Sequence, residues 1–136
     1  MRAITRPIVL VASFVITVCF APVAAAETVA LPEGPRASGV AFVDNPAIVD
    51  SHPIRPDSWS RVAGDRAVAL NFYTGTPECY GVHATVAETA DTVTVELRGG
   101  ALPEASGRAC IMIAVSGTLN VPLQAPLGSR QVLSTY

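Results

Sequence analysis

Two histidines, His52 and His83, are the side chains in this sequence best suited to acid–base chemistry. His83 lies in an apolar–polar alternation that predicts a β-strand, on the face opposite Val82 and Ala84, so we expect it at the surface. A histidine that activates a serine also needs an orienting acid and a nucleophile, and no G-x-S-x-G or other nucleophile motif is present. The histidines alone do not establish catalysis, and a small secreted enzyme that uses His83 or His52 is kept as an alternative to a binding role.

His52 stands in the segment VDSHPIRPD, close in sequence to Asp50 and Asp57. Such a loop can bind a cation, but its spacing matches neither an EF-hand nor a zinc pattern. The Gly99–Gly100 pair lacks the strand–loop–helix context of a phosphate-binding loop, and no two glutamates are marked as a facing acid–base pair. The sequence thus predicts no catalytic residue, no metal ligand and no cofactor.

Three cysteines are present, and two of them, Cys79 and Cys110, lie beyond the N-terminal segment. In an exported chain such a pair predicts one disulfide, closing a loop of about 30 residues and stabilising by roughly 3–4 kcal/mol. Their spacing is not that of a C-x-x-C redox motif. Cys79 and His83 would share one face of a strand but stand about 13 Å apart along it, too far to bind one metal ion.

The first 26 residues have the layout of a secretory signal peptide. Arg2 and Arg6 precede an uncharged apolar run from Pro7, which ends in Ala24–Ala25–Ala26 before Glu27. We expect cleavage after Ala26 and a protein that is secreted or held at the cell envelope.

Two alternatives would keep the chain at a membrane. The 20 residues 7–26 could span a bilayer if uncleaved, although Pro22 favours a break before a cleavage site. Cys19 could be lipidated as in a lipoprotein, but the bulky Val18 before it fits that processing pattern poorly. A membrane partner is expected only in these two cases.

Removing the signal peptide leaves 110 residues, which suits one domain with one core. Seven arginines and eleven acidic residues then remain, a formal net charge of −4. This mildly acidic balance argues against a nucleic-acid partner. All basic residues are arginine, as a GC-rich genome would favour.

Residues 27–52 are predicted to be a loosely ordered leader, because prolines and glycines recur too often for a regular element. A short edge segment around Val40–Val43 is the exception. Residues 53–136 are predicted to form the β-domain. Its expected strands span residues 59–62, 67–74, 80–86, 92–98, 109–115, 119–123 and 131–134.

Within this domain, Ala109–Val115 is nearly all apolar and is predicted to be a central strand buried on both faces, with a turn at Ser116–Gly117. Gly99–Arg108 is predicted to be a loop. Six to seven short strands without a helix predict an all-β fold, a small antiparallel β-sandwich (immunoglobulin-like) or barrel with one disulfide.

The stretches from Phe72 to Gly100 and from Ala109 to Arg130 resemble a group of small exported actinobacterial proteins. The shared features are the two cysteines and a closing V-x-L-x-x-P-L-G-x-R motif, here Val121 to Arg130. The resemblance covers roughly Pro53 to Leu133. It implies an exported, disulfide-bonded β-domain and carries over no catalytic residue.

These observations predict a non-enzymatic β-domain of the cell envelope or secretome that binds an unidentified extracytoplasmic protein or envelope component, or is a structural module. Its contact surface would be the apolar rim near the bridge or a free strand edge. A secreted protein inhibitor is a further alternative, and Gly99–Arg108 is the loop that it would use.

Overall fold

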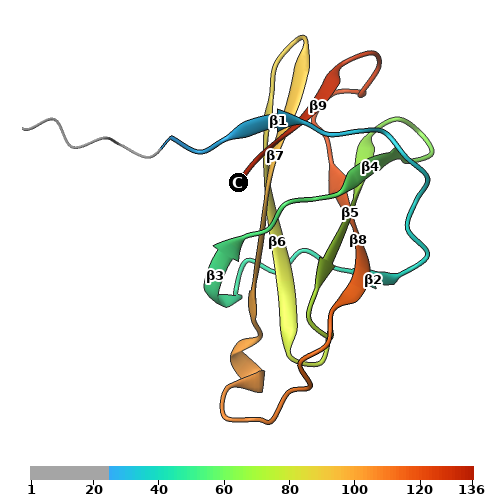
Figure 1. Cartoon of the computed structure of the whole chain (residues 1–136). Helices are drawn as coiled ribbons and strands as arrows, with labels where there is room; N and C mark the ends of the chain where they lie inside the picture. The colour runs from blue at the N-terminus through green and yellow to red at the C-terminus, as the bar shows by residue number, and fades with distance from the viewer. Residues whose placement is uncertain (1–24) are drawn as a thin grey trace, which may run out of the picture.

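A computed structural model describes residues 25–136, which form two β-sheets packed face to face (Figure 1). Cys19 and nearly all of the predicted signal peptide lie outside the described residues. The predicted all-β class is confirmed, with nine strands in the described part: β1 (Thr28–Ala30), β2 (Val40–Phe42), β3 (Val49–Pro53), β4 (Ser58–Arg61), β5 (Ala67–Thr74), β6 (Tyr80–Glu88), β7 (Thr92–Ala101), β8 (Val115–Pro122) and β9 (Gln131–Thr135). A 3₁₀ turn, η1 (Pro103–Ala105), precedes β8. Within residues 25–136, no helix has the length and hydrophobicity needed to cross a membrane.

The first sheet is built around β7. β6 pairs antiparallel along one of its edges, through a hairpin in which Thr89 and Thr92 exchange hydrogen bonds. On the other edge, β9 lies parallel to the first half of β7 and β3 antiparallel to the second half. β1 extends this sheet beyond β9. The second sheet has the order β2-β8-β5-β4, and its β2–β8 pair is also parallel. The predicted antiparallel fold therefore carries two parallel pairings.

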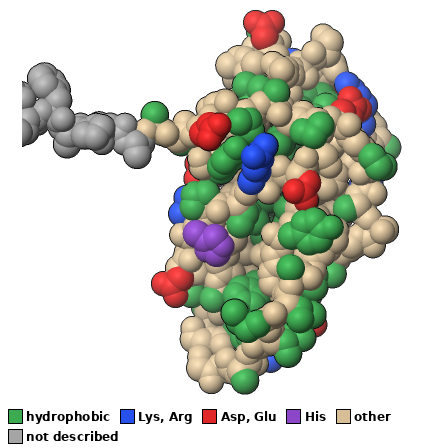
Figure 2. Space-filling view, viewed as in Figure 1, with side chains coloured by type: hydrophobic (Ala, Val, Ile, Leu, Met, Phe, Trp, Pro, Cys, Tyr) green, Lys and Arg blue, Asp and Glu red, His purple; other side chains and the backbone are tan. Residues whose placement is uncertain are grey.

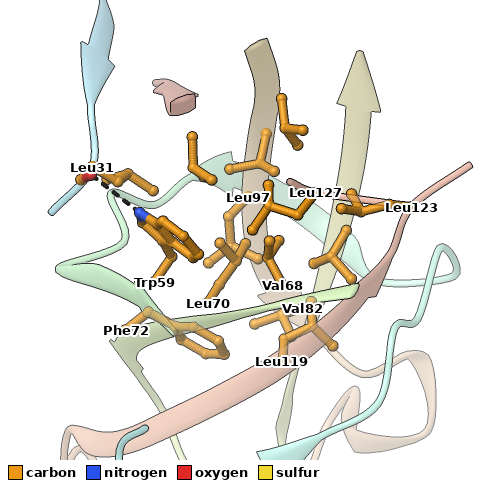
Figure 3. Close-up of a cluster of buried hydrophobic side chains, with 14 residues drawn as sticks. Leu31, Trp59, Val68, Leu70, Phe72, Val82, Leu97, Leu119, Leu123 and Leu127 are labelled. Carbon is orange, nitrogen blue, oxygen red and sulfur yellow. Dashed lines mark hydrogen bonds between the residues drawn. The ribbon is translucent and has the colours of Figure 1, made fainter. Parts of the chain in front are cut away.

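The core lies between the sheets and follows the predicted period of two. In β7, Val93, Val95 and Leu97 are fully buried, while the residues between them are partly exposed. On the facing sheet, Leu70 and Phe72 of β5 pack into the same cluster (Figure 3). The alternation in the sequence therefore correctly predicted which face of these two strands is buried.

The segment predicted to be a loose leader is instead part of both sheets, because it supplies β1, β2 and β3. Its first part closes one seam between the sheets, that is, one of the two gaps where an edge strand of one sheet faces an edge strand of the other. Leu31, just after β1, donates its N–H to Val132 of β9 at 3.0 Å. The chain then crosses to β4, where Gly34 donates to Trp59 O at 2.8 Å, and the Trp59 indole donates to Leu31 O at 3.2 Å (Figure 3).

The second part of this segment closes the opposite seam. β2 lies beside β8, and two residues further on Asp44 forms a parallel bridge to Val82 of β6. Asn45 donates its N–H to Val82 O at 2.8 Å. Prolines and glycines recur here because the chain changes sheet twice. Gly39, for example, lies so close to the backbone of Ser116 that a Cβ would not fit.

Asn71 of β5 holds the crossing segment against the second sheet. Its side chain is buried, and its Oδ1 accepts the N–H of Ala37 at 3.0 Å. Its amide group donates to Pro35 O at 3.3 Å and to the hydroxyls of Ser58 and Ser60 at 3.0 and 2.9 Å. One polar side chain in the sheet thereby satisfies groups of the crossing segment and of β4.

The predicted central strand Ala109–Val115 is wrong, because β8 begins only at Val115 and residues 109–114 have no strand partner. The predicted turn at Ser116–Gly117 is also wrong, since both residues lie within β8. The physical reason is that β5 ends at Thr74, opposite Val115, so nothing extends its ladder. The predicted loop Gly99–Arg108 begins later than expected, because β7 continues to Ala101.

Replacing Asn71 by alanine should lower the free energy of unfolding by about 1–3 kcal/mol, because it leaves the Ala37 N–H and the buried Ser60 hydroxyl without this partner. Urea unfolding of residues 27–136 measures this difference. Asn120→Ala is the matched control, since Asn120 is exposed and accepts one surface hydrogen bond from Arg36. Its effect should stay within about 0.5 kcal/mol. Equal effects of the two substitutions would contradict the role given to Asn71.

Candidate binding surface beside the disulfide

His83 lies on β6 at the seam closed by Asp44. Its Nδ1 is 3.0 and 3.1 Å from the two carboxylate oxygens of Asp44. The same carboxylate accepts the N–H of Ala84 at 2.8 Å, so it also covers an open backbone donor at the strand edge. His83 therefore has an orienting acid, contributed by a residue 39 positions away that the sequence did not single out. Within residues 25–136, neither ring nitrogen has a serine, threonine or cysteine as a hydrogen-bond partner.

His52 lies on β3, exposed and opposite Gly99 of β7. Asp50 on the same strand has a left-handed backbone, with φ of 52°, at the irregularity in the β3–β7 register. No group of three or more His, Cys, Asp or Glu side chains in the described part of the chain is arranged to hold a metal ion. The structure does not bring His52 and His83 into one hydrogen-bonded cluster.

The predicted disulfide Cys79–Cys110 is confirmed, with a Cα–Cα distance of 6.2 Å. Cys79 is buried just before β6, where its N–H donates to Thr76 O at 3.1 Å and its carbonyl accepts from Leu102 at 2.8 Å. The bridge ties Cys110 to this turn and so holds the chain that follows it against one end of the sandwich.

The residues after the bridge form an exposed apolar segment, Ile111–Ala114. Ile111, Met112 and Ile113 are 63%, 91% and 54% exposed, and Tyr73 at the neighbouring end of β5 is 61% exposed. A cleft of about 280 Å³ separates this segment from Tyr80 and the turn at Thr74 and Gly75. Hydrophobic side chains also gather at the lower end of the face shown in Figure 2.

The backbone of this segment is as open as its side chains. Residues 109–114 make no backbone hydrogen bond to another part of the described chain. The chain on each side is fixed, by the disulfide at Cys110 and by the β5–β8 ladder at Val115. The apolar segment is therefore a short, anchored stretch with β-forming residues and no partner, which is the usual description of a contact site or an aggregation hazard.

Most of Gly99–Arg108, the loop expected to act in an inhibitor, belongs to regular elements of the fold. Its first residues belong to β7, and η1 follows with Ala105 buried against the domain. Only the short stretch from Ser106 to Arg108 is exposed outside these elements. No observation therefore favours the inhibitor over a binding role for the neighbouring apolar segment.

Arg130, the last residue of the V-x-L-x-x-P-L-G-x-R motif, has a structural role. Its side chain is 9% exposed, and it ion-pairs with Glu88 of β6 at 3.0 Å. All of its N–H groups have acceptors: Glu88 Oε1 and the carbonyls of Thr89, Ala125, Pro126 and Leu127. The resemblance included this motif but implied no function for it. In the structure, the Arg130 side chain of the motif fixes the loop between β8 and β9.

Glu88 completes this cluster by accepting the N–H of Gln124 at 2.7 Å. That hydrogen bond, followed by those from Arg130 and Ala125 and the attraction of the Arg130 charge, lowers the pKa of Glu88 from its ordinary value of 4.5. Glu88 thereby joins the end of β6 to the chain after β8. Asp44 closes the opposite end of the same seam.

Between these two carboxylates the edges of β6 and β8 part around an opening of about 210 Å³. Its walls are mainly apolar, with Ala84 and Val86 on one side and Leu119 and Val121 on the other. Pockets that enclose a small molecule usually measure roughly 300–1,000 Å³. This opening is smaller, and the apolar segment is the stronger candidate site because its contiguous large apolar side chains are exposed to a partner.

Searches with family models, against curated proteins and against solved structures found no match to this chain. Function is therefore inferred from the chain's own residues.

Glu88→Gln should flatten the acid side of the stability–pH curve. Because the native pKa of Glu88 is lowered, its contribution is fully present above about pH 4.5 and is lost as the pH falls through the native pKa. Urea unfolding from pH 7 to 3 should show wild type more stable than the variant at neutral pH, with the difference shrinking in acid. Parallel curves for the two proteins would contradict this role for Glu88.

Proposed function

We propose that this protein is an exported, non-enzymatic binding module of the cell envelope or secretome, and that the apolar segment Ile111–Ala114 is its contact surface. The signal-peptide pattern of residues 1–26 supports export. The Cys79–Cys110 disulfide supports an oxidising compartment.

The observation that carries the binding role is the run of three exposed large apolar side chains, Ile111 to Ile113. Isolated exposed apolar residues are common on protein surfaces, whereas contiguous ones mark contact sites. Because the segment is anchored at Cys110 and at β8, little conformational entropy is lost when a partner covers it. An anchored apolar segment is therefore well suited to binding.

The enzyme alternative has one observation in its favour, the His83–Asp44 pair at 3.0 Å. This pair supplies a base and an orienting acid, two of the three parts of a nucleophilic site. The same carboxylate also accepts the N–H of Ala84, so the pair is equally explained as closure of a strand edge. Without a hydroxyl or thiol partner for His83 in the described residues, binding remains the proposed function.

The proposal predicts that the apolar segment retains the protein at its site of action. Cells that make the protein would be separated into medium and envelope fractions, and the mature chain, beginning at Glu27, quantified in each by intact mass. The triple variant I111S/M112S/I113S should shift at least several-fold from the envelope fraction to the medium, because it removes the apolar contact surface while leaving the core intact.

Two matched variants make this result specific. Val43→Ser changes an apolar residue that is 83% exposed elsewhere on the domain, and it should leave the distribution unchanged. His83→Ala should also leave it unchanged. Equal retention of the wild type and the triple variant in the envelope fraction would contradict the proposed contact surface. A change in this distribution caused by His83→Ala but not by the triple variant would favour the enzyme.

A further inference from the structure

We propose that the apolar segment pairs with the same segment of a second copy of this chain, as two antiparallel strands related by a two-fold axis at Met112. This inference rests on the proposed function and names its partner. Three observations lead to it: the open backbone, the symmetry of the local sequence and the size of the exposed apolar surface.

The open backbone decides what kind of partner fits. Residues 109–114 have no backbone hydrogen bonds within the described chain, so a partner that covers their side chains must also offer donors and acceptors. A lipid surface cannot do this, because an unsatisfied N–H or C=O group costs several kcal/mol in hydrocarbon. A strand supplies both groups at the required spacing. The partner is therefore an extended polypeptide segment.

The local sequence is complementary to itself. Around Met112 the chain reads Cys-Ile-Met-Ile-Ala, so an antiparallel pairing centred there sets Ile111 opposite Ile113 of the second copy. The same register sets Cys110 opposite Ala114, small residue against small residue. β-branched side chains favour strands because they pack well against their cross-strand neighbours.

Charge does not oppose this register. No charged residue lies between Arg108 and Arg130, so the paired segments contain none. Arg108 itself would fall opposite Ser116 of the second copy, and no like charges meet. An acidic or basic partner peptide would gain nothing from this uncharged surface, whereas an identical uncharged segment matches it.

The exposed area is sufficient for a weak dimer. Ile111, Met112, Ile113 and Tyr73 are between 54% and 91% exposed. Side chains of this size expose on the order of 500 Å² per copy, or about 1,000 Å² for both copies, so even complete coverage only reaches the lower limit for a specific interface. The dimer should therefore form reversibly, with a concentration-dependent mass.

Sedimentation equilibrium of the exported, oxidised protein over a range of concentrations tests this inference. The wild type should approach twice the monomer mass at high concentration. Met112→Glu sets two carboxylates opposite each other at the axis, so it should weaken association at least tenfold. Val43→Glu is the matched control for an added charge on an exposed apolar residue, and it should associate like the wild type.

The decisive arm mixes Met112→Glu with Met112→Lys. Each variant alone should be monomeric, and an equimolar mixture should dimerise because opposite charges then meet at the axis. Met112 is 91% exposed, so both variants should fold, and an intact mass lighter by two hydrogens until reduction checks the disulfide. Failure of the mixture to associate would overturn the pairing.

A wild type that stays monomeric at all concentrations would also overturn it. If that monomer binds vesicles of phosphatidylglycerol and phosphatidylethanolamine in a Met112-dependent way, the partner is a lipid surface instead. If the envelope retention described above still depends on Ile111–Ile113, the proposed function stands with a different protein partner. Loss of both results would remove the proposed function together with the dimer.

Discussion

The structure depends on the way residues 28–45 close both seams of the sandwich. A two-sheet sandwich leaves four strand edges whose N–H and C=O groups need partners. Here the N-terminal segment pairs first with β9 and β4, and then with β8 and β6, so the backbone hydrogen bonds run from each sheet into the other on both sides. The Trp59–Leu31 hydrogen bond and the Asn71 side chain fix the first crossing, and the Asp44 carboxylate fixes the second. Without this segment the core would be covered by two sheets with open edges.

The same constraint explains why Ile111–Ala114 stands out. Around the closed seams, exposed edge groups are covered by the chain's own residues: the N–H of Ala84 by Asp44, and that of Gln124 by Glu88. Within residues 25–136 the apolar segment has no such cover, although its residue types favour a strand and the disulfide holds it in place. In the described residues this anchored segment is thereby open to an external strand, which is the physical link between the fold and the proposed binding role.

The sequence predicted the strands with regular alternation and missed the features set by distant partners. β5 appears at its predicted bounds, and the inward residues of β7 are those that the period of two selects. The cysteine pair predicted the bridge because only one pairing was possible. The strands at 28–30 and 49–53 were missed because prolines and glycines that serve sheet crossings have the same local pattern as a flexible linker. Ala109–Val115 was misassigned because apolar composition cannot show whether a strand has a partner. Asp44 lacked any local signal, since its role depends on a histidine 39 residues away.

The most direct test of this account is unfolding followed by the fluorescence of Trp59, the single tryptophan, which is buried at the first seam. Urea titrations would compare residues 27–136 with a chain that begins at residue 46. If the N-terminal segment closes the fold, the shorter chain should show the red-shifted emission of an exposed indole without urea and should lose its cooperative transition. A shorter chain with the same emission and the same unfolding midpoint would show that the sandwich is stable with open seams, and would contradict the account.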